Sequence, residues 1–292
     1  MNIRIIPRLD IKGPNLVKGI HLEGLRVLGK PQDSARFYYQ DGADELIYQD
    51  AVASLYGRNS LLDIIQRTAS EIFIPLTVGG GLRTVEDIRA VLRAGADKVA
   101  INTAAVHRPE FVHQAALAFG SSTIVVSIEA IKMPDGHYEA HVDCGRERTG
   151  VDAYEWAIQA AELGAGEILV TSVDQEGTGK GYDLELTRQI AESVSIPVIA
   201  LGGAGKLEHI YEVITEGKAD AVSLASMLHY DYIHKIQVRE QEYNIEGNIE
   251  FLKGKRGAMR RKHIEGTSVY QIKKYLAKKN VNCRLQSGVT ND

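Results

Sequence analysis

Two glycine-rich turns of this chain have the composition of phosphate-binding loops. Gly79-Gly80-Gly81 and Gly202-Gly203-Ala204-Gly205 each follow a short apolar run and precede an amphipathic one. Glycine lets backbone N–H groups approach an anion closely, and the N-terminus of the following helix adds a favourable dipole. Each turn has a small polar partner after the next apolar run, Asn102-Thr103 for the first turn and Ala225-Ser226 for the second. Glycine also serves in ordinary tight turns, but two matching copies favour two phosphate sites.

These two turns belong to an internal repeat. Residues 74–106 read IPLTVGGGLRTVEDIRAVLRAGADKVAINTAAV, and residues 196–228 read IPVIALGGAGKLEHIYEVITEGKADAVSLASML. The period is far longer than the roughly 20–50 residues of a solenoid. It predicts one domain assembled from two duplicated halves, with a phosphate site in each. Two such sites suit a long substrate with a phosphate at each end.

Two acidic residues occupy equivalent places in the two halves. Asp10 follows the apolar run RIIPRL, and Glu129 follows the apolar run TIVVSI. Carboxyl groups on opposite sides of a substrate can divide general-acid and general-base catalysis between them. Either acid could instead pair with a nearby cation such as Lys18, but their equivalent placement favours catalysis.

Short apolar runs alternate with longer amphipathic runs along the chain, and this pattern predicts eight parallel strands connected by helices. Eight such units close into a (β/α)8 barrel, an α/β fold whose active site lies at the C-terminal ends of the strands. The doubly wound alternative would require a GxGxxG turn after an early strand, and the sequence has none. The predicted strands are residues 4–10, 45–50, 76–78, 98–101, 123–129, 168–171, 198–201 and 221–224.

The two ends of the predicted barrel carry different polar residues. At the C-terminal end, Asp50 and Thr171 end two strands and join the glycine turns and the two acids as candidate substrate contacts. At the opposite end, four strands begin with residues that could form a ring of alternating charge, namely Arg4, Glu45, Lys98 and Glu167. On the residues alone, such a ring would be a solvated set of ion pairs of modest stabilising value. Residues 12–29 are predicted as a long polar loop, and residues 134–136 as the turn of a hairpin.

The composition is that of an ordinary globular protein, with 292 residues, 44% hydrophobic and 25% charged. The net charge of -4 argues against nucleic-acid binding. The sequence reads as having neither a signal peptide nor the roughly 18 consecutive apolar residues that span a membrane. Its two cysteines, Cys144 and Cys283, form no CxxC pair and indicate a reducing, cytoplasmic location. No cluster of Cys and His has the spacing of a zinc site, so no metal or other cofactor is expected.

Taken together, these motifs resemble those of the cyclase subunit of imidazole glycerol phosphate synthase, an enzyme of histidine biosynthesis. The resemblance covers about residues 1–230 and resumes near Val269; it rests on IIPRLDIK, LVKG, GADELIYQD, IPLTVGGGLRT, GADKVAINTAAV, GAGEILVTSVDQEGT, GYDLEL, SIPVIALGGAG and ADAVSLAS, in this order. It implies a carbon–nitrogen lyase that receives ammonia from a glutaminase subunit in a heterodimer. The implied substrate is the bis-phosphorylated ribonucleotide PRFAR, which is converted to imidazole glycerol phosphate and the carboxamide ribotide AICAR.

The resemblance also implies roles for individual residues. Asp10 matches the general acid, Glu129 stands at the position of the general base, and Lys18 matches a lysine on a flexible loop that closes over the substrate. The four charged residues at the strand starts match a gate through which ammonia enters. The implied phosphate sites are Gly81, Asn102 and Thr103 on one side and Gly177, Gly203, Ala225 and Ser226 on the other, to which their position adds Gly80 and Gly202.

Several positions depart from the family pattern. The family has Asp at the position of Glu129, Cys at that of Arg8 and Asp at that of Glu176. Side chains alternate along a strand, so Arg8 should point into the barrel with Asp10, on the expected route of ammonia. A buried guanidinium needs a partner, and we expect that partner to be Glu129.

An insertion of about residues 231–266, before the last helix, is a further departure from the family pattern. We expect the barrel to form a single domain over residues 1–292. The insertion contains the basic cluster KGKRGAMRRKH. We expect a solvated loop or helical hairpin there rather than a contact for an anion or a partner.

Two other functions stay open on the sequence. Related barrels work with a glutaminase-like partner to install amidino groups on surface-polysaccharide sugars, and Arg8 and Glu129 would suit such a changed substrate. The two phosphate turns argue against that function, because a nucleotide-sugar would not use its two ends in the same way. The second alternative is a non-catalytic barrel that binds and activates a glutaminase.

Overall fold

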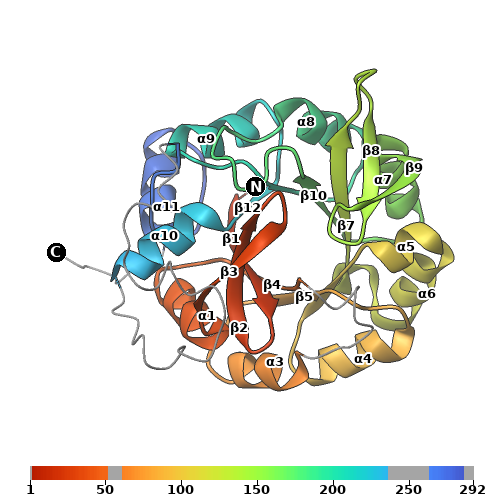
Figure 1. The fold of residues 1–292 in the computed structure, drawn as a ribbon, viewed down its shortest axis with the longest axis horizontal. Coiled ribbons are helices and arrows are strands. Elements are labelled where there is room, and N and C mark those ends of the chain that lie inside the picture. Colours follow the sequence, from red (N-terminus) through yellow and green to blue (C-terminus); the bar gives the residue numbers. More distant parts are fainter. Residues whose placement is uncertain (1, 52–60, 236–262, 286–292) are drawn as a thin grey trace.

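The protein folds as a closed barrel of eight parallel strands surrounded by helices (Figure 1). The computed structural model describes residues 2–51, 61–235 and 263–285. Each barrel strand pairs in parallel with the next, and pairing of the last strand with the first closes the circle. The strands in circular order are β1 (Arg4–Lys12), β4 (Leu46–Asp50), β5 (Leu76–Gly79), β6 (Lys98–Ile101), β7 (Ile124–Lys132), β10 (Glu167–Ser172), β11 (Val198–Leu201) and β12 (Ala221–Leu224).

The helices form the outer layer, as Figure 1 shows. They are α1 (Pro31–Gln40), α3 (Leu62–Ala69), α4 (Val85–Arg93), α5 (Thr103–His107), α6 (Glu110–Phe119), α7 (Ala153–Glu162), α8 (Leu184–Ser193), α9 (Leu207–Thr215), α10 (Ser226–Lys235) and α11 (Val269–Lys278), with a 3-10 turn η1 (Ser121–Thr123) before β7. The predicted (β/α)8 barrel is confirmed. The duplication of its two halves stays a prediction from the sequence repeat.

Alternation of side chains along the strands creates two apolar layers. Residues on the outer faces of the strands pack against the helices, with Phe111 of α6 and Trp156 of α7 among the buried side chains there. Residues on the inner faces fill the barrel axis with a separate layer, made of Ile6, Ile47, Ala100, Val125, Leu169, Ile199, Leu201 and Ala221. The axis is therefore packed with side chains between its two ends.

The helix after the first glycine turn begins where the sequence predicts. Thr84 accepts a hydrogen bond from the backbone N–H of Asp87 at 3.1 Å, and the Asp87 carboxylate accepts one from the backbone N–H of Thr84 at 2.9 Å. This capping box satisfies two N–H groups that have no partner within the helix. It therefore fixes the start of α4 directly after Gly79–Gly81.

The prediction of a polar loop at residues 12–29 is wrong. The segment forms an antiparallel hairpin of β2 (Asn15–Ile20) and β3 (Glu23–Gly29), and β2 also pairs with the end of β1. Leu16, Val17, Val27 and Leu28 are buried, and His21-Leu22 make the turn with positive φ angles of 49° and 62°. The glycines and charged residues of the segment concealed these two short apolar pairs. In Figure 1 the hairpin lies across the centre of the barrel.

The predicted hairpin turn at residues 134–136 is confirmed. Gly136 donates its backbone N–H to the carbonyl of Met133 at 2.9 Å, and β7 continues through this turn into β8 (Tyr138–Val142). A further strand, β9 (Glu147–Asp152), pairs with β8 and was not predicted. The tip between β8 and β9 brings residues 143–146 towards the C-terminal end of the barrel.

Most of the predicted insertion lies outside the described residues, which lack 236–262 and with them nearly all of the basic cluster. Its described ends are the last turns of α10 and residues 263–266. At the second end Glu265 donates its backbone N–H to Gly205 at 2.8 Å, and Ile264 is buried. The prediction of one domain over the whole chain, with a solvated insertion, stays a prediction.

Candidate active site

The two predicted catalytic carboxyls lie on opposite sides of the barrel mouth. Asp10 is on β1 and Glu129 on β7, and these strands are four positions apart in the circle of eight. Their exposed fractions are only 4% and 5%. The strand order therefore places two buried acids across the mouth from one another, as the sequence predicts.

Asp10 forms a buried ion pair with Arg8. The Nε of Arg8 donates to Oδ1 of Asp10 at 2.8 Å. Burial by itself would raise the pKa of Asp10, but the charge of Arg8, its hydrogen bond and the charge of Lys18 outweigh burial and lower this pKa. Asp10 is therefore held as a carboxylate.

The expected pairing of Arg8 with Glu129 is wrong. Residues two apart on a strand point to the same face, so Arg8 and Asp10 are direct neighbours on β1, whereas Glu129 lies on the opposite strand. Arg8 does point into the barrel as predicted, and its charge acts on Glu129 only as a weaker, longer-range effect than on Asp10.

Glu129 differs from Asp10 because no cation forms an ion pair with it among the residues that the structure describes. It accepts a hydrogen bond from the Nδ2 of Asn102 at 3.1 Å. Burial raises the pKa of Glu129 to about 7, opposed in part by the charge of Arg8 and by a hydrogen bond from the backbone of Gly145. The carboxyl thus keeps its proton in a substantial fraction of molecules near neutral pH.

Lys18 lies on β2 rather than on an irregular loop, and its side chain is 1% exposed. It forms an ion pair with Glu176, on the loop after β10. The hairpin makes two further contacts with that loop, both through His21. The backbone N–H of His21 donates to the backbone carbonyl of Glu176 at 3.1 Å, and its Nδ1 lies 2.9 Å from the carbonyl oxygen of Val173. The hairpin is therefore docked across the mouth.

The first predicted phosphate site lines a cavity of about 270 Å³. Gly80 and Gly81 have φ angles of 104° and 70°, and a β-carbon on Gly80 would lie 2.7 Å from the carbonyl oxygen of Asp50. Only glycine fits such a turn without strain. The cavity brings together the predicted residues Asp50, Gly80, Gly81, Asn102, Thr103 and Glu129.

The same cavity contains basic residues that the sequence reasoning missed. Arg83, His107 and Arg108 line it, and Arg108 donates to the carbonyl of Arg83 at 2.8 Å. The positive charges of the two arginines suit an anionic group bound at the glycine turn. Their positions directly after the first glycine turn and after Asn102-Thr103 were the available signal.

The second predicted phosphate site lies under the hairpin and does not line this cavity. Gly202 and Gly203 have φ angles of 99° and 105°, Ala225 and Ser226 are buried, and Ser226 begins α10. Gly177 lies against the hairpin, since a β-carbon there would be 3.2 Å from the Cα of Ile20. The two sites are on opposite sides of the mouth, at β5–β6 and at β11–β12.

Thr171 and Asn102 carry buried polar atoms with no hydrogen-bond partner among the described residues. These atoms are the Oγ1 of Thr171 and the Oδ1 of Asn102. Thr171 shares the inner face of β10 with Leu169, which belongs to the axial layer. Buried polar atoms usually have partners, so these two are free to contact a bound substrate.

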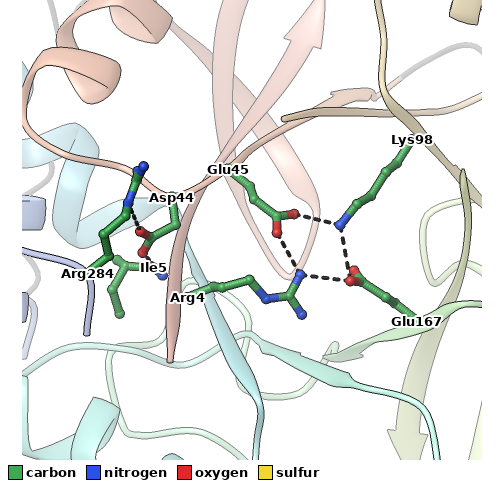
Figure 2. Close-up of polar contacts among 7 residues, drawn as sticks. All are labelled: Arg4, Ile5, Asp44, Glu45, Lys98, Glu167 and Arg284. Atoms are coloured by element: carbon green, nitrogen blue, oxygen red, sulfur yellow. Dashed lines mark hydrogen bonds and ion pairs between the residues drawn. The ribbon is translucent and has the colours of Figure 1, made fainter. Parts of the chain in front are cut away.

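The charged residues at the opposite end of the barrel form the predicted ring (Figure 2). Arg4 bridges Glu45 and Glu167 at 2.7 and 2.8 Å, and Lys98 bridges the same two carboxylates at 3.0 and 3.1 Å. The apolar axial layer separates this ring from the two catalytic acids. The ring is closed, with every member in contact with two residues of opposite charge.

In the part of the chain that the structure describes, no helix is long and apolar enough to cross a membrane.

Comparison with known proteins identifies the family. A family model described as "Histidine biosynthesis protein" matches residues 4–234, a range that includes both glycine turns, both acids and the charged ring. The protein "Imidazole glycerol phosphate synthase subunit HisF" of Legionella pneumophila is 60% identical over 207 residues, which are 71% of this chain and 98% of that protein. The chain therefore belongs to the histidine biosynthesis protein family, with the function of the cyclase subunit of imidazole glycerol phosphate synthase, a lyase.

Proposed function

We propose that this chain binds PRFAR by its two phosphates and uses ammonia from a separate glutaminase subunit to form imidazole glycerol phosphate and AICAR. The observation that carries the proposal is the arrangement at the mouth. Two glycine turns lie on opposite sides of it, at β5–β6 and β11–β12, and two buried carboxyls lie on the strands between them. A substrate held at both ends would present its centre to both carboxyls.

The charges of the site favour a division of roles opposite to the one that the resemblance implies. Asp10 is paired with Arg8 and stays ionised, so it suits proton abstraction. Glu129 has no cation in contact, and burial raises its pKa to about 7, so it suits proton donation. Two carboxyls whose environments push their pKa values apart are a common acid–base arrangement. We therefore assign Asp10 as the general base and Glu129 as the general acid.

A separate subunit is proposed as the source of ammonia, because neither cysteine of the chain suits a glutaminase nucleophile. Burial raises the pKa of Cys144 and of Cys283 to about 11, which leaves both as thiols near neutral pH. Both are free, in keeping with a cytoplasmic location. The charged ring lies at the end of the barrel away from the catalytic acids, which makes it the proposed entrance for ammonia.

Lys98→Ala tests the proposed entrance. Loss of two charge-assisted contacts in the ring should lower glutamine-dependent turnover by at least about tenfold, since even one such contact contributes roughly 1.5 kcal/mol. Turnover driven by added ammonium salt should stay within about twofold of the wild type, because free ammonia can reach the site from solution. Both rates are measured on the complex with a glutaminase subunit of an imidazole glycerol phosphate synthase.

Lys218→Ala is the matched control, because Lys218 forms an exposed ion pair with Glu192 outside the ring. It should change neither rate. If Lys98→Ala lowered the glutamine-dependent and ammonium-dependent rates equally, the ring would not be the entrance.

A further inference from the structure

Arg8 is a cation buried in the barrel at a position where the family resemblance places a cysteine. It is 4% exposed and shares the inner face of β1 with Arg4, Ile6 and Asp10. Ile6 belongs to the apolar axial layer, so Arg8 lies between that layer and the catalytic carboxylate. Burying a guanidinium is costly, and a buried ion pair is often no more stable than apolar residues of the same volume. A contribution to stability therefore does not explain the residue.

Arg8 is attracted by all three carboxyls of the mouth. Burial opposes its charged form, but Asp10, then Glu176, then Glu129 outweigh burial and raise the pKa of Arg8. Asp10 is the carboxyl in direct contact, through the 2.8 Å hydrogen bond from Nε. The hydrogen bond from Arg8 holds the Asp10 carboxylate in position and also keeps it ionised, because both side chains are on the same face of β1.

Within the cluster of Arg8, Lys18, Asp10, Glu176 and Glu129, the buried charges balance only when one carboxyl is protonated. Two cations, Arg8 and Lys18, face three carboxyls, Asp10, Glu176 and Glu129. Arg8 pairs with Asp10 and Lys18 pairs with Glu176, whereas Glu129 has the neutral amide of Asn102. Two complete ion pairs leave Glu129 as the group that holds a proton at least cost.

Other titratable groups lie near this cluster. Asp50, Arg83 and Arg108 line the cavity beside Glu129, but the charged groups with the largest effects on the pKa of Glu129 are Arg8, Asp10 and Asp143. His229, from α10, acts on Asp10, but burial and the charge of Lys18 lower its pKa to about 3, so it is neutral. Cys144 is a neutral thiol. Asp143, from the β8–β9 tip, adds a negative charge near Glu129 and so favours protonation of Glu129 further.

From this geometry we infer that Arg8 is a positioning residue of the cyclase site, which holds Asp10 as a fixed carboxylate base and thereby leaves the proton of the site on Glu129. The inference rests on the proposed acid–base roles of these two carboxyls. It explains why a cation occupies the axis directly beside one of them. Arg8 itself transfers no proton, because a guanidinium does not lose its charge in this pH range.

Removal of the Arg8 charge should make the two carboxyls compete for one proton. Without Arg8, Asp10 would be a buried carboxylate with no cation in contact, and its pKa would rise towards that of Glu129. The two groups would then titrate as a coupled pair. Arg8→Met, which keeps an unbranched side chain and removes the charge, should lower kcat by about a hundredfold and leave KM within about threefold.

The pH profile separates this role from a purely structural one. In Arg8→Met the acidic limb of the kcat profile should move up by about 1–2 pH units, because the base now ionises at higher pH. Arg8→Lys, which keeps a charge beside Asp10, should restore most of the rate and the original position of the limb. All profiles are measured with PRFAR and the full chain at one concentration of free ammonia, so that the titration of ammonium does not contribute.

An infrared titration of the same proteins requires no turnover. Wild type at about pH 6 should show the carbonyl band of one buried protonated carboxyl, absent from Glu129→Gln. Arg8→Met should show a second band, which disappears in the double variant Arg8→Met/Asp10→Asn. That double variant has no unpaired buried charge, so it supplies the baseline in which only the Glu129 band remains. If Arg8→Met alone folds poorly, Arg8→Gln, which keeps a hydrogen-bond donor beside Asp10 without the charge, should show the same second band.

The outcomes distinguish this inference from the proposed function. An unchanged profile and a single band in Arg8→Met would overturn the role of Arg8. Absence of the Glu129 band in wild type would overturn the assignment of the proton. The expected bands without any conversion of PRFAR would overturn the proposed reaction and leave the charge arrangement established.

Discussion

Asparagine in place of Asp10 should lower kcat for cyclisation by about a hundredfold to ten-thousandfold, the range for loss of a general base. The substitution keeps the shape of the side chain, and its oxygen can still accept the hydrogen bond that Arg8 donates at 2.8 Å. The affinity for PRFAR should change by less than about threefold, because phosphate binding is assigned to the glycine turns. Steady-state kinetics with ammonium and calorimetric titration of PRFAR measure the two effects.

Asp174→Asn is the control for this experiment. Asp174 is an exposed acid on the loop after β10, where it accepts a hydrogen bond from the backbone N–H of Lys132 at 2.9 Å. It should retain wild-type kinetics. A loss of PRFAR affinity in Asp10→Asn as large as the loss of kcat would contradict the separation of chemistry from binding.

Glutamine in place of Glu129 should lower kcat by about a hundredfold or more, because an amide cannot supply the proton. It should also change how stability depends on pH. Burial raises the pKa of this carboxyl from 4.5 to about 7. A raised carboxyl pKa gives stability that is fully present at low pH and is lost as pH rises through the folded value. The wild type should therefore lose on the order of 2–3 kcal/mol relative to Glu129→Gln between about pH 5 and pH 8.

Denaturant unfolding of both proteins across that pH range measures the stability effect without any substrate. A pH-independent difference would show that Glu129 is ionised throughout. Glu129→Asp is the companion variant for activity, because it restores the shorter acid of the family. It should preserve or raise the rate, and a collapse of activity would show that this site depends on the longer side chain.

Strand-level features of this fold were predictable because their signals are local. The eight apolar runs, the glycine turns and the charged residues at the strand starts follow directly from position along the strand. The ring of Arg4, Glu45, Lys98 and Glu167 could be predicted for this reason, since parallel strands in a barrel place their first residues at one end.

Features that depend on contacts between distant segments were missed. The β2–β3 hairpin reads as a polar loop because its buried pairs, Leu16-Val17 and Val27-Leu28, are short and stand among glycines and charged residues. The contact of Lys18 with Glu176 joins residues 158 apart in the chain, and no sequence pattern connects them. Arg8 pairs with Asp10, two residues away on the same strand, and not with Glu129 on the opposite strand as predicted.

The acid–base roles illustrate the same limit. The sequence identifies Asp10 and Glu129 as a pair but cannot say which one is protonated, because that depends on burial and on the cations around each. The sugar-amidating alternative rested on Arg8 and Glu129. The chain belongs to the family of the cyclase subunit, and the roles of Arg8 and Glu129 in that reaction are those proposed above.

The most direct test of the account is turnover of PRFAR by the purified chain alone, with a high concentration of ammonium salt near neutral pH, where Glu129 still holds its proton in a fraction of the molecules. This experiment bypasses both the partner subunit and the charged ring. The account predicts formation of imidazole glycerol phosphate and AICAR in equal amounts, at a rate that Asp10→Asn lowers by about a hundredfold or more. Tight binding of PRFAR without any product would contradict it, and would show that the charge cluster around Arg8 no longer supports the cyclase reaction.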